Sequence, residues 1–114
     1  MAATDDLNRT GTARTSAIST TKILAIGTVT SRGDGAARAS TMPLEIRETV
    51  RLHLEGYIEQ WFSQTNAAGV VFILNMSDLE TARALLTKLP LGRAGMMEFQ
   101  LIPMGPLTPL KLLL

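Results

Sequence analysis

Residues 56–76, GYIEQWFSQTNAAGVVFILNM, constrain the fold more than any other part of the chain. They predict two strands: residues 58–65, where polar and apolar residues are interleaved, and residues 69–76, which are almost entirely apolar. The residues between these strands include Asn66 and Gly69, and both types tolerate the positive φ angles of tight turns. We therefore expect a β-hairpin, and we expect the function to be carried by a face of the sheet that contains it.

Two further strands are expected, over residues 22–30 and 96–104. In the first of them, Ile23 and Ala25 should lie on one face and Leu24 and Ile26 on the other. Gly27 leaves a gap in one face of the first of these strands, where a backbone or a ligand could approach closely. Residues 31–40, SRGDGAARAS, are expected to form a loop.

A first helix is expected over residues 41–55, with Thr41 as its N-cap and Pro43 in its first turn. Its solvent-exposed side should carry Glu45 among other charged residues. The apolar stripe that should face the core consists of Met42, Ile46, Val50, His53 and Tyr57.

The spacing of Ser77 and Glu80 is that of a capping box, which predicts a second helix over residues 77–89, ended by Pro90. Its buried stripe should consist of Leu79, Ala82, Leu86 and Leu89. The order of elements is then β-α-β-β-α-β. This order predicts an α+β, ferredoxin-like fold, in which a four-stranded antiparallel sheet carries two helices on one face. The opposite face of the sheet is left uncovered.

The length of 114 residues predicts one folded domain, over residues 22–104. Residues 1–21 are rich in Thr, Ser and Ala and are expected to form a flexible N-terminal tail. Residues 105–114, GPLTPLKLLL, are strongly apolar. Because such a segment would promote aggregation in water, we expect this C-terminal tail to dock against a partner subunit.

The composition indicates which classes of partner are expected. The hydrophobic fraction of 46% and the mean hydropathy of +0.18 are high for a small domain, which favours a homodimer or a higher homo-oligomer. The net charge of +1 gives no reason to expect a nucleic acid partner, and the absence of cysteine excludes disulfides and thiolate chemistry. No segment approaches the roughly 20 apolar residues of a membrane span, and no secretory signal precedes the domain. A cytoplasmic protein without a membrane partner is expected.

The chain resembles the muconolactone isomerase-like proteins. Residues 82–104, ARALLTKLPLGRAGMMEFQLIPM, are similar to the C-terminal part of that family, and GYIEQWF and GVVF, at residues 56–62 and 69–72, are similar to its central hairpin. The resemblance spans residues 22–109. It implies a dimeric α+β barrel, in which two sheets enclose a shared cavity and a proton is moved within an unsaturated lactone without metal or organic cofactor. Wider relatives of that fold include cofactorless monooxygenases, polyketide cyclases and haem enzymes.

The chain departs from the isomerases in the hairpin, where Glu59, Gln60 and Ser63 stand in a stretch that is rich in His and Arg in that family. In the last strand Gln100 occupies the second acidic position. Cationic groups for a substrate carboxylate are therefore missing, and a neutral, hydrophobic substrate is expected.

Three residues are candidates for proton transfer. Glu98 is the first candidate base, because a carboxylate in an apolar cavity is suited to abstracting a proton next to a carbonyl. The alternative for Glu98 is a rim carboxylate paired with a basic residue. Glu59 is the second candidate, and its alternative role is that of a solvated acid at a strand end. His53 is the third, as the only histidine, although its place in the helix stripe also suits a core histidine.

Four residues are candidates for substrate binding. Gln100 and Gln60 could polarise a carbonyl, or they could join two sheets across a dimer. Trp61 could stack on a flat substrate, with Phe62 beside it, or could serve in packing alone. No metal-ligand spacing is visible, and no cofactor is expected.

The expected function is that of a cofactor-independent isomerase or cyclase that acts by proton transfer on a hydrophobic carbonyl or lactone substrate. A cofactorless monooxygenase and a non-catalytic binding or assembly module are the alternatives.

Overall fold

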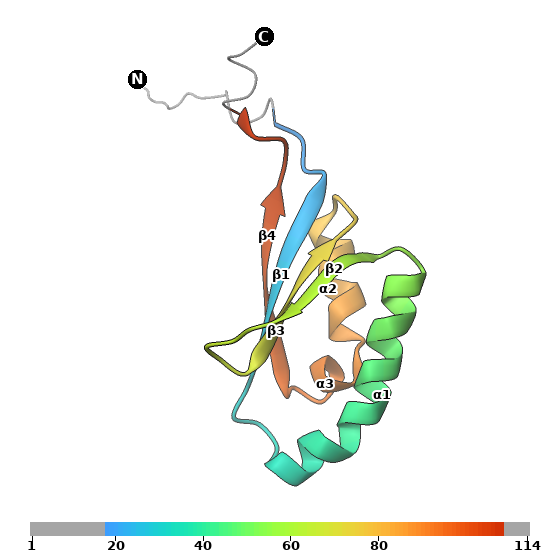
Figure 1. Cartoon of the computed structure of the whole chain (residues 1–114), viewed down its shortest axis with the longest axis vertical. Coiled ribbons are helices and arrows are strands. Elements are labelled where there is room, and N and C mark those ends of the chain that lie inside the picture. The colour runs from blue at the N-terminus through green and yellow to red at the C-terminus, as the bar shows by residue number, and fades with distance from the viewer. Residues whose placement is uncertain (1–17, 109–114) are drawn as a thin grey trace.

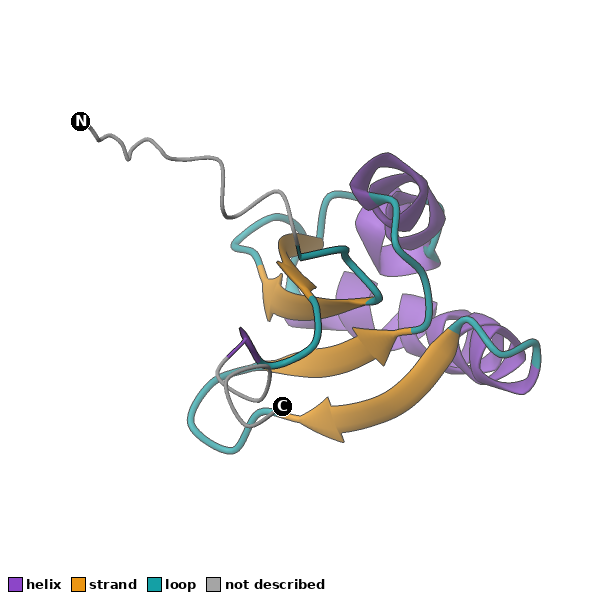
Figure 2. Cartoon of the chain, turned by 90° about the horizontal axis from the view of Figure 1, so that it is seen from above, coloured by secondary structure: helices purple, strands orange, loops and turns teal. Residues whose placement is uncertain are grey.

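Four strands pair into one antiparallel sheet in the order β2-β3-β1-β4 (Figure 1). The computed structural model describes residues 18–108. The strands are β1 (Lys22–Val29), β2 (Ile58–Ser63), β3 (Gly69–Leu74) and β4 (Met97–Met104). Helices α1 (Gly35–Leu54), α2 (Leu79–Thr87) and α3 (Pro90–Arg93) lie on one face of the sheet (Figure 2). This is the ferredoxin-like α+β arrangement that the order of elements predicts. Residues 1–17 and 109–114, to which most of both predicted tails belong, lie outside the described residues.

The core lies between the sheet and the helices. In the central strand β1, Ile23 and Ala25 are fully buried on the helix side, while Leu24 and Ile26 lie on the open side and are half-buried. This alternation is the one that the sequence predicts. A Cβ at Gly27 would lie only 2.6 Å from Cε1 of Phe99, so the predicted gap is filled by that ring from β4.

Helix α1 begins at Gly35, six residues before the predicted start. The N-cap is Asp34, whose Oδ1 accepts a hydrogen bond from the Ala37 amide at 2.7 Å. Thr41 lies inside the helix, where its hydroxyl donates to the Ala37 carbonyl at 2.9 Å. The predicted loop is therefore too long. Asp34 supplies a good cap, the alanines that follow favour helix, and Pro43 is accommodated within the helix rather than in its first turn.

Helix α2 begins at Leu79, and its N-cap is Asp78 rather than Ser77. Asp78 Oδ2 accepts hydrogen bonds from the amide and the hydroxyl of Thr81, at 2.9 and 2.6 Å. Of the predicted buried stripe, Ala82, Leu86 and Leu89 are buried, whereas Leu79, the first residue of the helix, is exposed. The turn of helix α3, which begins at Pro90, is absent from the sequence prediction.

Strand β2 contains a bulge that changes which side chains face the helices. The register shifts between Ile58 and Gln60, so that Ile58 pairs with Leu74 and Trp61 pairs with Phe72. Because Leu74 and Phe72 are both buried on the helix side, their partners share that side. Strict alternation from Ile58 would have placed Trp61 on the opposite face. The extra residue in the bulged strand thus directs Trp61 toward α1.

Candidate functional site

A cavity of about 390 Å³ opens between α1 and the half of the sheet formed by β2 and β3. Its volume lies in the range of small-molecule sites. Its walls are mostly apolar, and they come from α1, from the two strands, and from the start of α3 and β4: Met42, Glu45, Ile46, Thr49, Val50, Trp61, Phe62, Ser63, Val70, Phe72, Leu91 and Met97.

The apolar stripe of α1 faces this cavity instead of packing directly on the strands. Met42, Ile46 and Val50 remain 37%, 56% and 37% exposed, although all three lie on the side that was predicted to face the core. The stripe therefore has the predicted direction but not the predicted burial. Space is left between helix and sheet, and the stripe forms one wall of it.

Glu45 is the buried carboxylate of this cavity. It is only 7% exposed, and its Oε1 accepts a hydrogen bond from the Leu91 amide of α3 at 2.9 Å. The prediction that Glu45 lies on the solvent-exposed side of the helix is wrong. The reason is α3, which packs beside α1 and brings a buried backbone donor to the carboxylate.

Burial raises the pKa of the Glu45 carboxyl above its ordinary value. The Leu91 amide and the Thr49 hydroxyl lower that pKa but do not cancel the effect of burial. The Thr49 hydroxyl has a single proton, which it donates to the Glu45 backbone carbonyl at 2.8 Å, so it is a weak partner for the carboxylate. Glu45 is thus a carboxylate held in a poorly solvated site.

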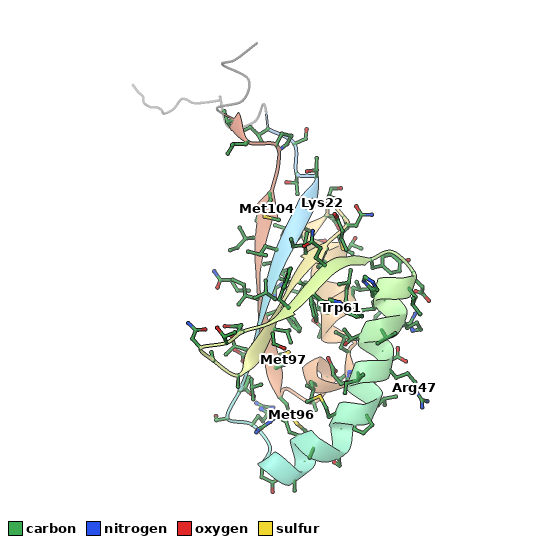
Figure 3. The ribbon with its side chains drawn as sticks, in the orientation of Figure 1. Lys22, Arg47, Trp61, Met96, Met97 and Met104 are labelled. Carbon is green, nitrogen blue, oxygen red and sulfur yellow. The ribbon has the colours of Figure 1, made fainter. Side chains whose placement is uncertain are left out.

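No cation compensates Glu45 within the cavity, because no Lys or Arg is among the described residues that line it. Arg51, further along α1, is engaged by Glu48 and Glu55 at 3.0 and 2.9 Å. Arg47 points away from the cavity, on the outer side of α1 (Figure 3). The site therefore combines apolar walls with one acidic group.

The sequence-predicted candidates divide between the two faces of the sheet. By strand register, Glu98, Gln100, Gln60 and Phe62 lie on the open face, together with Leu24 and Ile26 of β1. Glu98 and Gln100 are exposed there, as are Gln60 and Phe62. Phe62 nevertheless also borders the cavity, because β2 is an edge strand.

Glu59 lies in the bulge of β2 and is held by a cation. Lys22 Nζ contacts Glu59 Oε1 at 2.5 Å and also donates to Asn75 Oδ1 at 2.9 Å. Glu59 is therefore engaged by Lys22 at the bulge and does not line the cavity.

His53 and Trp61 come together on the helix side, at the end of α1. The two rings stack with their centroids 4.2 Å apart and their planes at 21°. His53 Nδ1 lies 2.8 Å from the carbonyl oxygen of Ile58. Trp61 lines the cavity, whereas His53 stacks on Trp61 and does not line the cavity.

The structure thus brings Trp61 and Phe62 to the cavity and leaves Glu98, Gln100, Gln60 and Glu59 outside it. Sequence reasoning missed Glu45, although one signal was present. Glu45 lies seven residues before Leu52, and this spacing of two turns places both residues on the same side of α1. Leu52 is apolar, so this spacing would have placed Glu45 on an apolar side of α1 rather than on the solvent-exposed side, whereas the contact with Leu91 that buries the carboxylate comes only from the tertiary structure.

Within residues 18–108, no cluster of three or more His, Asp or Glu side chains could hold a metal ion. None of the described helices is long and apolar enough to cross a membrane. No protein-family model matches the sequence, and no curated protein matches it either.

Proposed function

We propose that this protein is a cofactor-independent isomerase or cyclase that transfers a proton on a hydrophobic carbonyl or lactone substrate bound between α1 and the sheet. The observation that carries the proposal is the buried carboxylate of Glu45 in an otherwise apolar cavity. A carboxyl group whose pKa is raised by burial is a better match for proton transfer near neutral pH than a solvated one. The proposal keeps the reaction expected from the resemblance to muconolactone isomerase-like proteins and moves its acid–base group from Glu98 to Glu45.

The lining supports an assignment of roles. Glu45 would remove a proton next to the carbonyl group and return it at another carbon of the same substrate, so that no net proton is lost. Ser63, which lines the cavity from β2, carries the hydroxyl that would donate to the carbonyl oxygen. The indole of Trp61 would cover a flat substrate.

The same lining supports a neutral substrate. A carboxylate or phosphate on the substrate would enter a cavity that already holds Glu45 and has no cation among its described lining residues. Two dyes provide a matched test, because N-phenyl-1-naphthylamine is neutral and 1-anilinonaphthalene-8-sulfonate has the same scaffold plus one sulfonate. We expect the neutral dye to bind more tightly, and Glu45→Gln to reduce the difference. Equal binding of both dyes to the unmodified protein would contradict the assignment.

The reaction is tested by deuterium incorporation from D2O into a panel of unsaturated lactones and polyketide-like ketones, in sealed vials with and without oxygen. Glu45→Gln and Glu98→Gln form a matched pair, since each removes one carboxylate of the same type. We expect oxygen-independent exchange that is lost in Glu45→Gln and retained in Glu98→Gln. The reverse pattern would move the chemistry to the open face, and turnover only with oxygen would establish a monooxygenase instead. No exchange with any member of the panel would leave the cavity as a binding site and refute the proposed reaction.

We also propose that the open face of the sheet pairs with a second copy of the chain, as in a dimeric α+β barrel. Two neighbouring rows of side chains on that face are largely apolar and carry no charge: Phe62, Val71, Ile26 and Gln100, followed by Gln60, Ile73, Leu24 and Ile102. An uncharged face of this kind is typical of an association surface. Glu98 and Lys22 flank these rows, at opposite ends of the β1–β4 pair. Sedimentation measures the mass in solution, and a monomer at all concentrations would refute this pairing.

A further inference from the structure

His53 contacts two features of β2 at once, although the residue does not line the cavity. Its Nδ1 lies 2.8 Å from the Ile58 carbonyl oxygen, just before the bulge, and its ring stacks on Trp61, just after the bulge. Because a carbonyl oxygen can only accept a hydrogen bond, Nδ1 must carry the proton. The hydrogen bond therefore sets both the tautomer and the orientation of the ring.

Trp61 lies at the edge of the sheet and is partly exposed. Strand β2 is at the edge of the sheet and pairs only with β3, so no neighbouring strand lies on its outer side. Trp61 as a whole is 39% exposed, and it is on the helix side only because of the bulge at Glu59. Figure 3 shows Trp61 between β2 and α1. A large side chain in this position needs a partner if it is to keep one orientation without a ligand.

We infer that His53 is a positioning residue that holds Trp61 as a preformed wall of the cavity. The inference rests on the proposed function, because it takes the cavity to be the ligand site. The hydrogen bond to Ile58 fixes the imidazole, and the imidazole fixes the indole by stacking. A ligand then meets a wall that is already ordered and does not bear the entropic cost of immobilising the Trp61 side chain.

The chain offers a direct probe, because Trp61 is its only tryptophan. Three variants separate the two contacts of His53. His53→Phe keeps an aromatic ring but no donor for Ile58, His53→Gln keeps a donor but no ring, and His53→Leu has neither. Arg51→Gln is the matched control, because it removes the ion pairs with Glu48 and Glu55 in the same turn of α1 and leaves both contacts of His53 in place.

Two measurements are made on each folded variant: the emission spectrum of Trp61, and the Kd for the neutral dye N-phenyl-1-naphthylamine. We expect His53→Leu and His53→Gln to shift the emission to longer wavelength and to weaken dye binding by about two- to tenfold, the cost of ordering one large side chain. His53→Phe should stay closer to the unmodified protein on both measures, because the stack is retained. Arg51→Gln should change neither.

Unchanged emission and Kd in His53→Leu would overturn the inference. An effect of Arg51→Gln equal to that of His53→Leu would also overturn it, because the end of α1 would then act only through the stability of the helix. The emission spectrum needs no ligand. If the unmodified protein fails to bind the dye, the cavity is refuted as an apolar ligand site, while the emission spectra still decide whether His53 orders Trp61.

Discussion

Replacing Glu45 by glutamine distinguishes a functional carboxylate from a structural one. Glutamine has the same length and keeps an oxygen that can accept the Leu91 amide, so the substitution removes the charge and little else. Glu45→Met has a similar length but no comparable acceptor. The pair of variants therefore separates the contribution of the charge from that of the hydrogen bond.

The sign of the charge contribution follows from the raised pKa of Glu45. A carboxyl whose pKa is higher in the folded state binds its proton more tightly there than in the unfolded chain. The contribution of this carboxyl to the free energy of unfolding is fully present below the ordinary glutamate pKa, and it is lost as the pH rises through the pKa of the folded state. At neutral and alkaline pH the charge is thus destabilising, and we expect Glu45→Gln to be at least as stable as the unmodified protein. This advantage should disappear on acidification.

The magnitude for Glu45→Met follows from the buried hydrogen bond. Leu91 is 1% exposed, and its amide donates to Glu45 over 2.9 Å. Removing the acceptor leaves a buried amide without a partner, which costs about 1–3 kcal/mol. For a domain of this size, the melting temperature falls by roughly 4–8 °C per kcal/mol.

Urea unfolding followed by circular dichroism, from acid to alkaline pH, measures both effects. We expect Glu45→Gln to gain stability relative to the unmodified protein as the pH rises, and to lose proton transfer in the deuterium assay. Glu45→Met should be less stable than Glu45→Gln at every pH, because only glutamine keeps an acceptor for the Leu91 amide. A loss of stability in Glu45→Gln as large as that in Glu45→Met at neutral pH would refute the reasoning, because the charge itself would then be a structural partner of α3.

Four further substitutions have expected outcomes. Gly27→Ala would place a Cβ 2.6 Å from Phe99 Cε1, and this overpacking should cost about 1–3 kcal/mol in urea unfolding. Asp34→Ala removes the N-cap of α1 and should cost about 1 kcal/mol, with faster amide exchange in the first turn of the helix. Hydrogen bonds from the side chain and the amide of Thr81 lower the pKa of Asp78. The stability that Asp78 contributes is therefore present above the ordinary aspartate pKa and is lost as the pH falls through the pKa of the folded state. Asp78→Asn should therefore flatten the acid limb of the stability curve. Ile26→Lys places a charge in the middle of the open face and should yield a monomer by sedimentation if the sheets pair as proposed.

Local periodicity accounts for what was correctly predicted. The predicted division of β1 into two faces is correct, and the hairpin and the antiparallel pairings of β1 with β3 and with β4 follow from the predicted order of elements. Helix α2 was located within two residues because its capping signal is local. The start of α1 was misplaced because Pro43 is a strong marker of a first turn, while Asp34 is an equally good cap further upstream.

The candidate site was predicted less well, because its parts depend on contacts between distant residues. Glu45 and Leu91 are 46 residues apart, and no local pattern indicates that the Leu91 amide will donate a hydrogen bond to the Glu45 carboxylate. The face of Trp61 depends on a bulge, which shifts a period of two by one residue and reverses every assignment beyond it.

The sequence by itself determined the strands, the main helices, their order and hence the ferredoxin-like fold, because each of these depends on the spacing of apolar residues along a few turns or a single strand. Only the tertiary structure decided that α1 stands away from the sheet around a cavity, that Trp61 faces this cavity, and that Glu45 is buried in it. Burial of a polar group is decided by what packs against it, and here that neighbour, α3, comes from a different part of the chain.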